Sequence, residues 1–354
     1  MANTIRGTDA RLARPPRSRM TGFERYLDRT AKKFDEYLLS FFEDGSHPDM
    51  TRYLYGPLRR FSDNAGKRHR PLICLLACEA VGGDPERAWP AAAAIEHFHT
   101  AALIHDDIED SSLTRRDVPC MHITEGEGLA INAGDLALAL VCGTVVHDEG
   151  LDDVTKLRVL DELVNMTTRT IEGQALDIGW ARDGRFDLTI EDYLVMANHK
   201  TAFYSGGVPL AVGAIIGGGT DEQIEALRSF GMAAGLAFQI QDDVLNLVGT
   251  KEATKKDFRS DVTEGKRTLV AIHALANSLE RERLVELLSA RTTDPGELAE
   301  AVAIMERAGS IEYAKRYARE LVQSAKAGLK AALPPSRART LLLSMADFFV
   351  KRAA

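Results

Sequence analysis

Two long stretches of this chain lack proline, and apolar residues recur through both at helical spacing. One lies between Pro119 and Pro209, and the other between Pro209 and Pro295. Because proline breaks the hydrogen bonding of a helix interior, such intervals leave room for long helices. The apolar segments are Leu129–Val146, Leu157–Ile171, Ile224–Val248 and Leu269–Leu288. Strand-like alternation of useful length is absent, so we predict an all-α fold. Pro48 and Pro57 break the segment His47–Asp63, where we expect a loop and a short helix.

The first residues differ from the rest of the chain. Residues 1–20 combine several arginines with two prolines and lack an apolar core, so we expect no secretory signal there. We predict a flexible N-terminal tail over residues 1–20. Since no low-complexity linker divides the remainder, we predict one large helical domain over residues 21–354.

Composition excludes several classes of protein. The net charge of −8 disfavours a general affinity for nucleic acid or anionic membranes. The longest weakly polar stretches, such as Tyr204–Gly219, fall short of the roughly 18 apolar residues that a membrane span needs, so none is predicted. Four cysteines in 354 residues form no disulfide framework, which favours a cytoplasmic protein.

An acidic cluster ends one of the apolar runs. Four of the five residues from Asp106 to Asp110 are acidic. In a helix Asp106 and Asp110 lie one turn apart on one face, with Asp107 turned away from it. Burying such a pair is costly unless a cation neutralises it, and oxygen ligands suit Mg²⁺ or a similar hard ion. For this motif alone, a solvated acidic helix end is the plainer explanation.

A second apolar run also ends in two aspartates. AALIHDDIED spans residues 101–110, and LAFQIQDDVLN spans residues 236–246. Two helices of this design could place carboxylates on opposite sides of a cavity. Asp-Asp after an apolar run also recurs by chance, so the similarity alone is modest evidence.

Lysine and arginine cluster in four places near these acidic motifs. The groups are GKRHRP at 66–71, Arg115-Arg116, Lys200-Thr201 and EGKR at 264–267. Each alone is more often a solvated surface. Together with two carboxylate clusters they suit a metal-bridged diphosphate, because arginine binds phosphate oxygens in pairs and lysine adds a point charge.

On these motifs the chain resembles the trans-type isoprenyl diphosphate synthases from roughly residue 66 to residue 266. GKRHRP is similar to the family's GKRxRP, DDIEDSSLTRR to its first aspartate-rich motif, and QIQDDVLN to its second. GQALD, Lys200-Thr201 and DVTEGK resemble three further motifs in the family's order. The details are more like the geranylgeranyl than the farnesyl enzymes. The resemblance implies the isoprenoid synthase fold, a helical bundle around a central cavity, and a homodimer.

The resemblance also implies a role for each matching residue. Several Mg²⁺ ions would be bound by Asp106, Asp110 and Asp242. Isopentenyl diphosphate would be bound by Lys67, Arg70, His99 and Arg116. The allylic diphosphate would be held by Arg115, Lys200, Thr201, Gln239, Lys256 and Lys266. The residues closest to the chemistry would be Asp106, Asp110, Arg115, Lys200 and Asp242.

The implied reaction joins isopentenyl diphosphate head-to-tail to an allylic diphosphate of C5 to C15. Mg²⁺ and cationic side chains assist ionisation of the allylic diphosphate, the double bond of isopentenyl diphosphate attacks the carbocation, and a proton is lost. No side-chain nucleophile is needed, and no nucleophile motif is found. The cavity has to exclude water, which would quench the cation.

The resemblance also implies that the bulk of side chains a turn or two before the first acidic cluster sets the length of the product. Ala101 and Ala102 lie five and four residues before Asp106 and are too small to form a floor under a short product. Phe98 lies one turn further down and is predicted to be the floor. This favours a product longer than C15, with C20 expected and C25 or more as the alternative.

Two residues depart from the family pattern, and two other functions compete. Asp117 stands where glycine is usual after Arg-Arg, and Asn246 replaces the last aspartate of the second motif. A class I terpene cyclase would share the fold and the first acidic motif but needs no second diphosphate site. A non-catalytic helical partner would have lost its aspartates or cations, and this chain keeps both.

Overall fold

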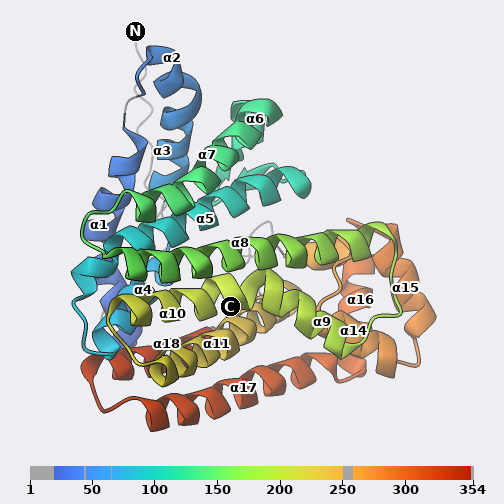
Figure 1. Cartoon of the computed structure of the whole chain (residues 1–354). Coiled ribbons are helices and arrows are strands. Elements are labelled where there is room, and N and C mark those ends of the chain that lie inside the picture. The colour runs from blue at the N-terminus through green and yellow to red at the C-terminus, as the bar shows by residue number, and fades with distance from the viewer. Residues whose placement is uncertain (1–19, 44, 65, 250–257, 352–354) are drawn as a thin grey trace.

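A computed structural model describes residues 20–43, 45–64, 66–249 and 258–351 (Figure 1). These residues are almost entirely helical, and their one sheet is a two-stranded hairpin. The all-α prediction is therefore confirmed. The predicted tail lies outside the described residues except for Met20, so its flexibility and the domain limits stay predictions.

The helices and strands follow one another in this order. They are α1 (Gly22–Leu39), η2 (Ser40–Phe42), α2 (Pro48–Met50), η3 (Thr51–Tyr55), α3 (Gly56–Asp63), α4 (His69–Ala80), η4 (Pro85–Ala88), α5 (Trp89–Glu109), β1 (Thr114–Arg115), β2 (Val118–Pro119), α6 (Met121–Thr124), α7 (Glu127–Val146), α8 (Asp153–Arg182), α9 (Ile190–Ala197), η5 (Asn198–Gly207), α10 (Val208–Ile216), α11 (Asp221–Val248), α13 (Ser260–Thr263), α14 (Leu269–Asn277), α15 (Arg281–Ala290), α16 (Pro295–Arg307), α17 (Ser310–Ala332) and α18 (Arg337–Lys351).

The helices form layers around α10, α11 and η5. In Figure 1, α5, α7 and α8 lie on one side of these elements, and α17 covers the other side. α11 packs against η5, α10 and α17, while α4 packs against α10, α5 and α18. This arrangement brings the C-terminal ends of α5 and α11 to the same part of the molecule as η5, which α8 contacts along one side.

Local signals explain where the site-bearing helices begin. α11 starts with a capping box, in which Thr220 accepts from the N–H of Gln223 and the Gln223 side chain accepts from the N–H of Thr220. α8 starts at Asp152, whose carboxylate accepts from the Thr155 N–H at 3.0 Å. Both helices then run for seven turns or more, so each spans much of the bundle.

The segment from His47 to Asp63 differs from our expectation. Its two prolines predicted a loop followed by a short helix, whereas the structure has helical turns from Pro48 to Asp63. Pro48 and Pro57 both lie in first helical turns, where the missing N–H is not needed for a helix hydrogen bond. In this segment proline starts helices instead of breaking them.

α7 is the most apolar long helix of the described chain. By length and composition alone it could cross a membrane, with a mean hydropathy of 1.9 in its most apolar window. The sequence prediction of no membrane span overlooked this segment. One such helix is weak evidence for a span, and α7 packs extensively against α5. Only 39% of that window is buried, however, so part of its apolar surface faces outward.

Candidate active site

The first acidic cluster lies at the C-terminal end of α5. Asp106 and Asp107 occupy the last turn, and Asp110 is the C-cap residue. Unpaired carbonyls give this helix end a partial negative charge, so aspartates are unfavourable there without cations nearby. Burial raises the pKa of Asp110 to about 6, with Lys266 lowering it and Asp106 raising it. The cluster is thus electrostatically arranged to attract positive charge.

Arg115 contacts two of these aspartates. Its Nε donates to Asp107 Oδ2 at 2.8 Å, and its Nη2 donates to Asp106 Oδ2 at 3.3 Å. Asp107 is buried, whereas Asp106 and Asp110 stay partly exposed, as helical spacing predicted. Arg115 therefore lies within reach of anything bound to Asp106, although its contact with the allylic diphosphate stays a prediction.

The β1–β2 hairpin places Arg115 and its neighbour. Its register leaves Arg116 and Asp117 as a two-residue loop, with φ of +53° and +66°. Positive φ at both positions is typical of a type I′ turn, which favours glycine, and aspartate tolerates this backbone better than most residues. Arg116 Nη1 donates to the Asn64 carbonyl at 2.6 Å, and its Nη2 lies near Gly66. The hairpin thus brings Arg116 to the GKRHRP segment.

The GQALD motif on α8 connects the first cluster to η5. A Cβ on Gly173 would lie 2.2 Å from the backbone nitrogen of Lys200, so only glycine allows this close approach. Gln174 Nε2 donates to Asp106 Oδ1 at 3.3 Å and to Glu109 Oε2 at 2.6 Å. No residue of this motif was given a role from the sequence. The recurrence of polar residues among the apolar positions of a helix was the available signal.

Asp177 and Lys200 form a buried ion pair through Lys200 Nζ. Burial acts to raise the pKa of Asp177, yet Lys200 and Lys266 hold it below its usual value. Burial likewise acts to lower the pKa of Lys200, and Asp177 more than compensates. Lys200 is therefore kept charged, as a residue that binds diphosphate has to be. η5, the π-helix that carries it, is a type of element frequent at functional sites.

The second acidic cluster lies in the last turns of α11. Asp243 is buried and accepts from Tyr193 Oη at 3.1 Å and from Gln239 Nε2 at 2.7 Å. Gln239 Oε1 in turn accepts from the Thr201 hydroxyl at 2.8 Å. Burial raises the pKa of Asp243 to about 7, although the hydrogen bonds from Gln239 and Tyr193 act to lower it. The negative charge of Asp242 also raises this pKa. Asp242 is more exposed than Asp243, which suits its predicted role as a metal ligand.

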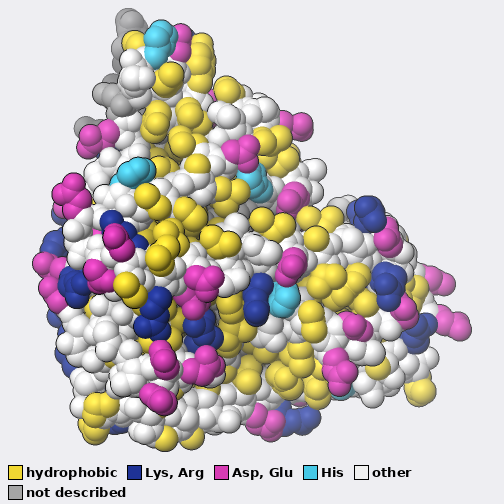
Figure 2. All heavy atoms as spheres, viewed as in Figure 1, with side chains coloured by type: hydrophobic (Ala, Val, Ile, Leu, Met, Phe, Trp, Pro, Cys, Tyr) yellow, Lys and Arg dark blue, Asp and Glu magenta, His cyan; other side chains and the backbone are white. Residues whose placement is uncertain are grey.

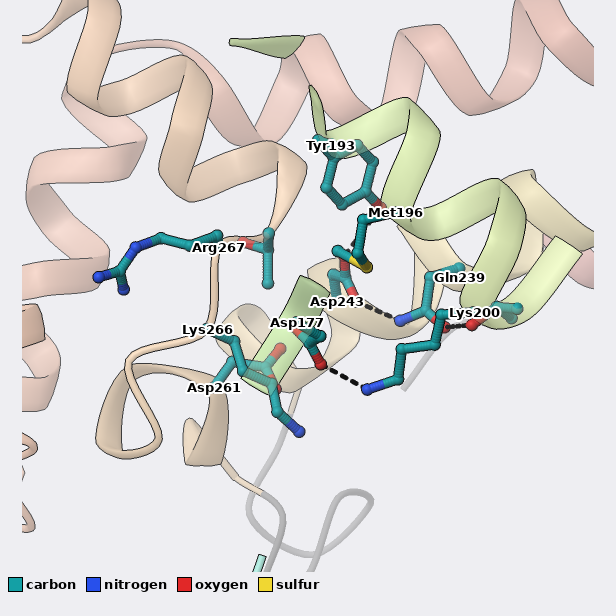
Figure 3. A pocket seen from close by; sticks show the side chains of 11 residues that line it. Asp177, Tyr193, Met196, Lys200, Gln239, Asp243, Asp261, Lys266 and Arg267 are labelled. Atoms are coloured by element: carbon teal, nitrogen blue, oxygen red, sulfur yellow. Dashed lines mark hydrogen bonds and ion pairs between the residues drawn. The ribbon is translucent and has the colours of Figure 1, made fainter. Parts of the chain in front are cut away.

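A pocket of about 400 Å³, its open mouth included, lies between these elements (Figure 3). Residues from α8, α9, η5, α11 and the α13–α14 segment line it. They are Asp177, Tyr193, Met196, Lys200, Thr201, Gln239, Asp243, Asp261, Lys266, Arg267 and Thr268. In Figure 3, Lys200 points toward Asp177 from one side, and Asp261 and Lys266 lie on the other side of Asp177. Four of the predicted allylic-site residues therefore meet in one place.

Lys266 lies near both acidic clusters. Its Nζ lies 3.6 Å from Asp110 Oδ2 and 2.6 Å from Glu264 Oε2. It also lines the pocket together with Asp243. Lys266 thus contacts the first cluster while its segment borders the second, as expected if the two clusters face one cavity.

The predicted isopentenyl diphosphate residues form a separate cation group. Arg70 donates to Ser205 Oγ at 3.1 Å through Nε and to Tyr204 Oη at 2.8 Å through Nη2. Its Nη1 lies 3.1 Å from His99 Nε2. Since arginine can only donate, His99 Nε2 accepts, and a neutral His99 carries its proton on Nδ1. Burial and the charge of Arg70 hold the pKa of His99 well below its usual range, so the ring is neutral.

The structure gives fewer contacts for the other predicted diphosphate-binding residues. Arg116 lies near enough to His99 to lower its pKa as well. Lys67 is exposed in the same GKRHRP segment. Arg68 is buried and pairs with Glu96 at 2.6 Å and with Asp35 at 2.7 Å, so it builds the fold. The predicted allylic residue Lys256 lies outside the described residues.

The predicted product-measuring residues lie along α5 below Asp106. Phe98 packs edge-on against Tyr204, with 5.6 Å between ring centroids. Ala101 is fully buried, whereas Ala102 keeps some exposed surface. Ala102 lies four residues before Asp106 and four after Phe98, so these three side chains share one side of the helix. Ala102 is therefore the less buried of the two alanines and lies on the side of the first cluster.

The oxygen-only donor set fits Mg²⁺. Within the described ranges no three His, Cys, Asp or Glu residues lie close enough to hold an ion by themselves. Mg²⁺ is commonly bound by one or two carboxylates, with water and substrate phosphate oxygens completing its shell. Asp106 and Asp110 on one side and Asp242 on the other match such incomplete sites, which a diphosphate would complete.

Several polar residues of the site were given no role from the sequence, although Gln174, Asp177 and Asp261 belong to the GQALD and DVTEGK motifs. The full set is Gln174, Asp177, Tyr193, Tyr204, Ser205 and Asp261. Each acts on a residue that was anticipated, by pairing with it or by holding its side chain. Their residue types alone carry no such signal, because Tyr and Ser within helices are common.

Known proteins similar to this chain share its fold and are prenyl diphosphate synthases by name. The family model described as polyprenyl synthetase matches residues 51–305. A short chain isoprenyl diphosphate synthase of Methanothermobacter thermautotrophicus is 43% identical over 81% of this chain and 86% of its own. A geranylfarnesyl diphosphate synthase of Natronomonas pharaonis is 37% identical over 85% and 90%. The crystal structure of a geranylgeranyl pyrophosphate synthetase from Pyrococcus horikoshii superposes with a TM-score of 0.86 at 35% identity, covering 93% of this chain and 98% of that one.

Proposed function

Because this chain belongs to the polyprenyl synthetase family and is a trans-prenyltransferase, we propose that it makes geranylgeranyl diphosphate, the C20 product, from isopentenyl diphosphate and allylic diphosphates of C5 to C15. The relatives named above act on prenyl chains of different lengths, so product length is the part of this proposal that needs its own support. Both the site and α5 contribute to that support.

One observation carries the proposal: the described residues include two groups of side chains that can bind phosphate, and the groups differ in composition. Lys200 and Lys266 lie among the carboxylates of the two acidic clusters. Arg70 and His99 form the other group with Tyr204 and without a carboxylate partner in that network. Two groups suit two diphosphates, which a synthase binds and a class I cyclase does not need.

The first group is suited to ionisation of the allylic substrate. Lys200 and Lys266 are held charged and lie beside Asp106 and Asp110, where a diphosphate bridged to these aspartates would lie. Fixed cations there stabilise the charge that develops on the leaving diphosphate. When bound, Mg²⁺ at Asp106, Asp110 and Asp242 supplies further charge neutralisation, acting as a Lewis acid.

The second group is suited to orienting isopentenyl diphosphate. The Nδ1 of His99 is buried and makes no hydrogen bond within the described residues, so its N–H is available to a phosphate oxygen. Arg70 adds a guanidinium held by Ser205 and Tyr204, which fixes its direction. Positioning the attacking double bond in this way replaces a chance encounter with an oriented one. The apolar lower side of α5 keeps water from the carbocation.

Product length is proposed from α5. Ala102 is small and partly exposed one turn below Asp106, and Phe98 lies a further turn down and packs against Tyr204. A small side chain at the first turn and a ring at the second support a product longer than C15, and we propose C20.

A homodimer is proposed from an exposed apolar face. On α8, Leu157, Val164, Ile171 and Ile178 recur every seventh residue and are 40–68% exposed. Seven-residue spacing keeps side chains on one side of a helix. Figure 2 shows hydrophobic side chains gathered over the neighbouring region of α7 and α8. A second copy of the chain would cover this face. We expect Ile171→Lys to lower the mass of the assembly measured by sedimentation.

A cytoplasmic location is also proposed. All four cysteines are free, and three of them, Cys74, Cys78 and Cys120, are buried in the bundle. Buried thiols of this kind suit a reducing compartment.

Incubation of the purified protein with Mg²⁺, isopentenyl diphosphate and each of the C5, C10 and C15 allylic diphosphates tests the proposal. We expect C20 diphosphate from all three primers. A C25 or longer product would replace geranylgeranyl diphosphate by the longer-chain alternative. Consumption of an allylic diphosphate without isopentenyl diphosphate, yielding a hydrocarbon, would instead identify a cyclase.

A further inference from the structure

Asn246 connects α11 to α13 through both halves of its amide. Its Nδ2 donates to Ser260 Oγ at 3.0 Å, and its Oδ1 accepts from the Asp261 N–H at 3.2 Å. Its backbone carbonyl accepts from the Arg259 N–H at 2.8 Å. Three successive residues at the start of α13 are thus fastened to one residue of α11.

A further backbone hydrogen bond connects Asp261 to Lys266. The Asp261 carbonyl accepts from the Lys266 N–H at 2.8 Å, which closes the turn after α13. Lys266 then extends its Nζ to within 3.6 Å of Asp110 on α5. The position of this ammonium group therefore depends on where α13 lies, and the contacts of Asn246 hold α13 on α11.

The charge of the region explains why an amide suits position 246. Asp261 and Asp243 repel each other, and Asp242 lies one turn before Asn246 on the same helix. An aspartate at position 246 would keep the acceptor for the Asp261 N–H but add another carboxylate to this group. Asparagine makes both hydrogen bonds without that charge, so Asp261 can approach the end of α11.

We propose that Asn246 is a positioning residue that fixes α13 on α11 and so places Lys266 for the allylic diphosphate. This rests on the proposed function of the pocket. It assigns Asn246 to the architecture of the Lys266 segment and not to the metal ligands, although its place in the second aspartate-rich motif would suggest a ligand.

Asn246→Ala tests the proposal, with Asn277→Ala as a matched control. Asn277 is exposed, and its side-chain amide donates to the His273 carbonyl of its own helix at 2.8 Å. Since each lost hydrogen bond is worth about two- to tenfold, we expect Asn246→Ala to raise KM for the allylic diphosphate about tenfold. KM for isopentenyl diphosphate should change less than about twofold, because Arg70 and His99 are elsewhere.

Hydrogen exchange on the ligand-free protein gives a readout independent of activity. In Asn246→Ala, peptides covering residues 258–266 should exchange about threefold faster or more, since the Asp261 N–H loses its acceptor. Peptides from α5 and α8 should be unchanged, which also shows that the variant is folded. Asn277→Ala should leave residues 258–266 unchanged.

Two further variants separate positioning from metal binding. In a Lys266→Ala background, Asn246→Ala should raise the allylic KM no further, because both changes act through one ammonium group. Asn246→Asp should not lower the Mg²⁺ concentration needed for half-maximal rate. A several-fold lower requirement with an unchanged allylic KM would show that position 246 faces the metal and would overturn the proposal.

The proposal and the proposed function fail in different ways. Unchanged exchange of residues 258–266 in Asn246→Ala, or additive effects of Asn246→Ala and Lys266→Ala, would overturn the positioning role in an active synthase. Absence of any prenyl product from the wild-type protein would overturn the proposed function. In that case faster exchange in Asn246→Ala would still support the fastening of α13.

Discussion

The C-terminal ends of α5 and α11 have the same sequence design, an apolar run closed by two aspartates, but their aspartates are satisfied differently. At α5, Asp106 and Asp107 are bonded by the charged Arg115, and Asp110 lies near Lys266. At α11, Asp243 is bonded by the neutral donors of Tyr193 and Gln239. Like motifs therefore supply one cluster whose aspartates pair with cations and another in which the buried Asp243 is held by neutral donors.

Within each pair, the two aspartates differ in exposure and are therefore suited to different roles. At α5 the exposed Asp106 and Asp110 are suited to bind a metal, and the buried Asp107 anchors Arg115. At α11 the more exposed Asp242 is the metal ligand candidate, and Asp243 anchors Gln239 and, through it, Thr201. In both pairs the more exposed aspartate is the candidate metal ligand, and its buried neighbour bonds to a residue predicted to hold the allylic diphosphate.

The largest expected effect comes from removing either metal-facing carboxylate. Asp106→Asn and Asp242→Asn should each lower kcat on the order of a thousandfold, because each loses charge that neutralises the leaving diphosphate. Asp161→Asn, at an exposed position on α8, is the control. Steady-state kinetics at saturating Mg²⁺ measures the effect. Activity within tenfold of wild type for Asp242→Asn would mean that the two clusters do not act together.

A second prediction concerns the apolar surface below the α5 cluster, which we expect to measure the product. Ala102→Tyr should shorten the product by one C5 unit or more, since the ring would fill space on the Asp106 side. Ala101→Tyr should act mainly through overpacking, which costs about 1–3 kcal/mol of stability, because Ala101 is fully buried. Phe98→Ala should lengthen the product. Chromatography of the dephosphorylated products checks all three, and equal shortening by the two tyrosines would reject this orientation of α5.

The pH dependence of stability should differ between the two clusters. The folded state raises the pKa of Asp243 from 3.8 to about 7 and that of Asp110 from 3.8 to about 6, chiefly by burial. A raised carboxyl pKa contributes stability that is fully present below about 4 and is lost as pH rises through the folded value. Metal-free protein should therefore lose a few degrees of Tm between pH 4 and pH 7.

Substitutions separate the two contributions to this slope. Asp243→Asn should flatten the fall of Tm between pH 6 and pH 7, whereas Asp110→Asn should flatten it only below about pH 6. Calorimetry in metal-free buffer over this range makes the measurement. A Tm that rises with pH through this window in the wild-type protein would contradict both assignments.

The smallest expected effect lies in the turn that follows the first cluster. Asp117 has a φ of +66°, and glycine adopts this backbone without steric cost. Asp117→Gly should change the free energy of unfolding by about 0.5 kcal/mol in the stabilising direction and should not raise KM for isopentenyl diphosphate. Arg116→Gly, at φ +53°, relieves similar strain but removes a cation, so it should raise that KM. Urea denaturation and kinetics compare them.

Much of the fold and of the site could be predicted from sequence because their signals are local. Helical spacing predicted α7, α8 and α11, and the position of Asp110 one turn from Asp106 followed from helix geometry. The prediction of a loop around Pro48 and Pro57 was wrong, because proline disrupts the interior of a helix but is tolerated in its first turn. Gln174 and Tyr193 were missed because their partners lie 68 and 50 residues away in the chain.

By itself, the sequence determined that this protein is all-helical, that two of its helices end in aspartate pairs and that cations accompany them. Only the tertiary structure decided which aspartate of each pair is exposed, that Lys200 pairs with Asp177, and that Asn246 fastens α13. The physical reason is that helical periodicity and charge are properties of neighbouring residues. Burial and hydrogen bonding, in contrast, depend on which helices pack against one another, as the approach of α8 to η5 at Gly173 shows.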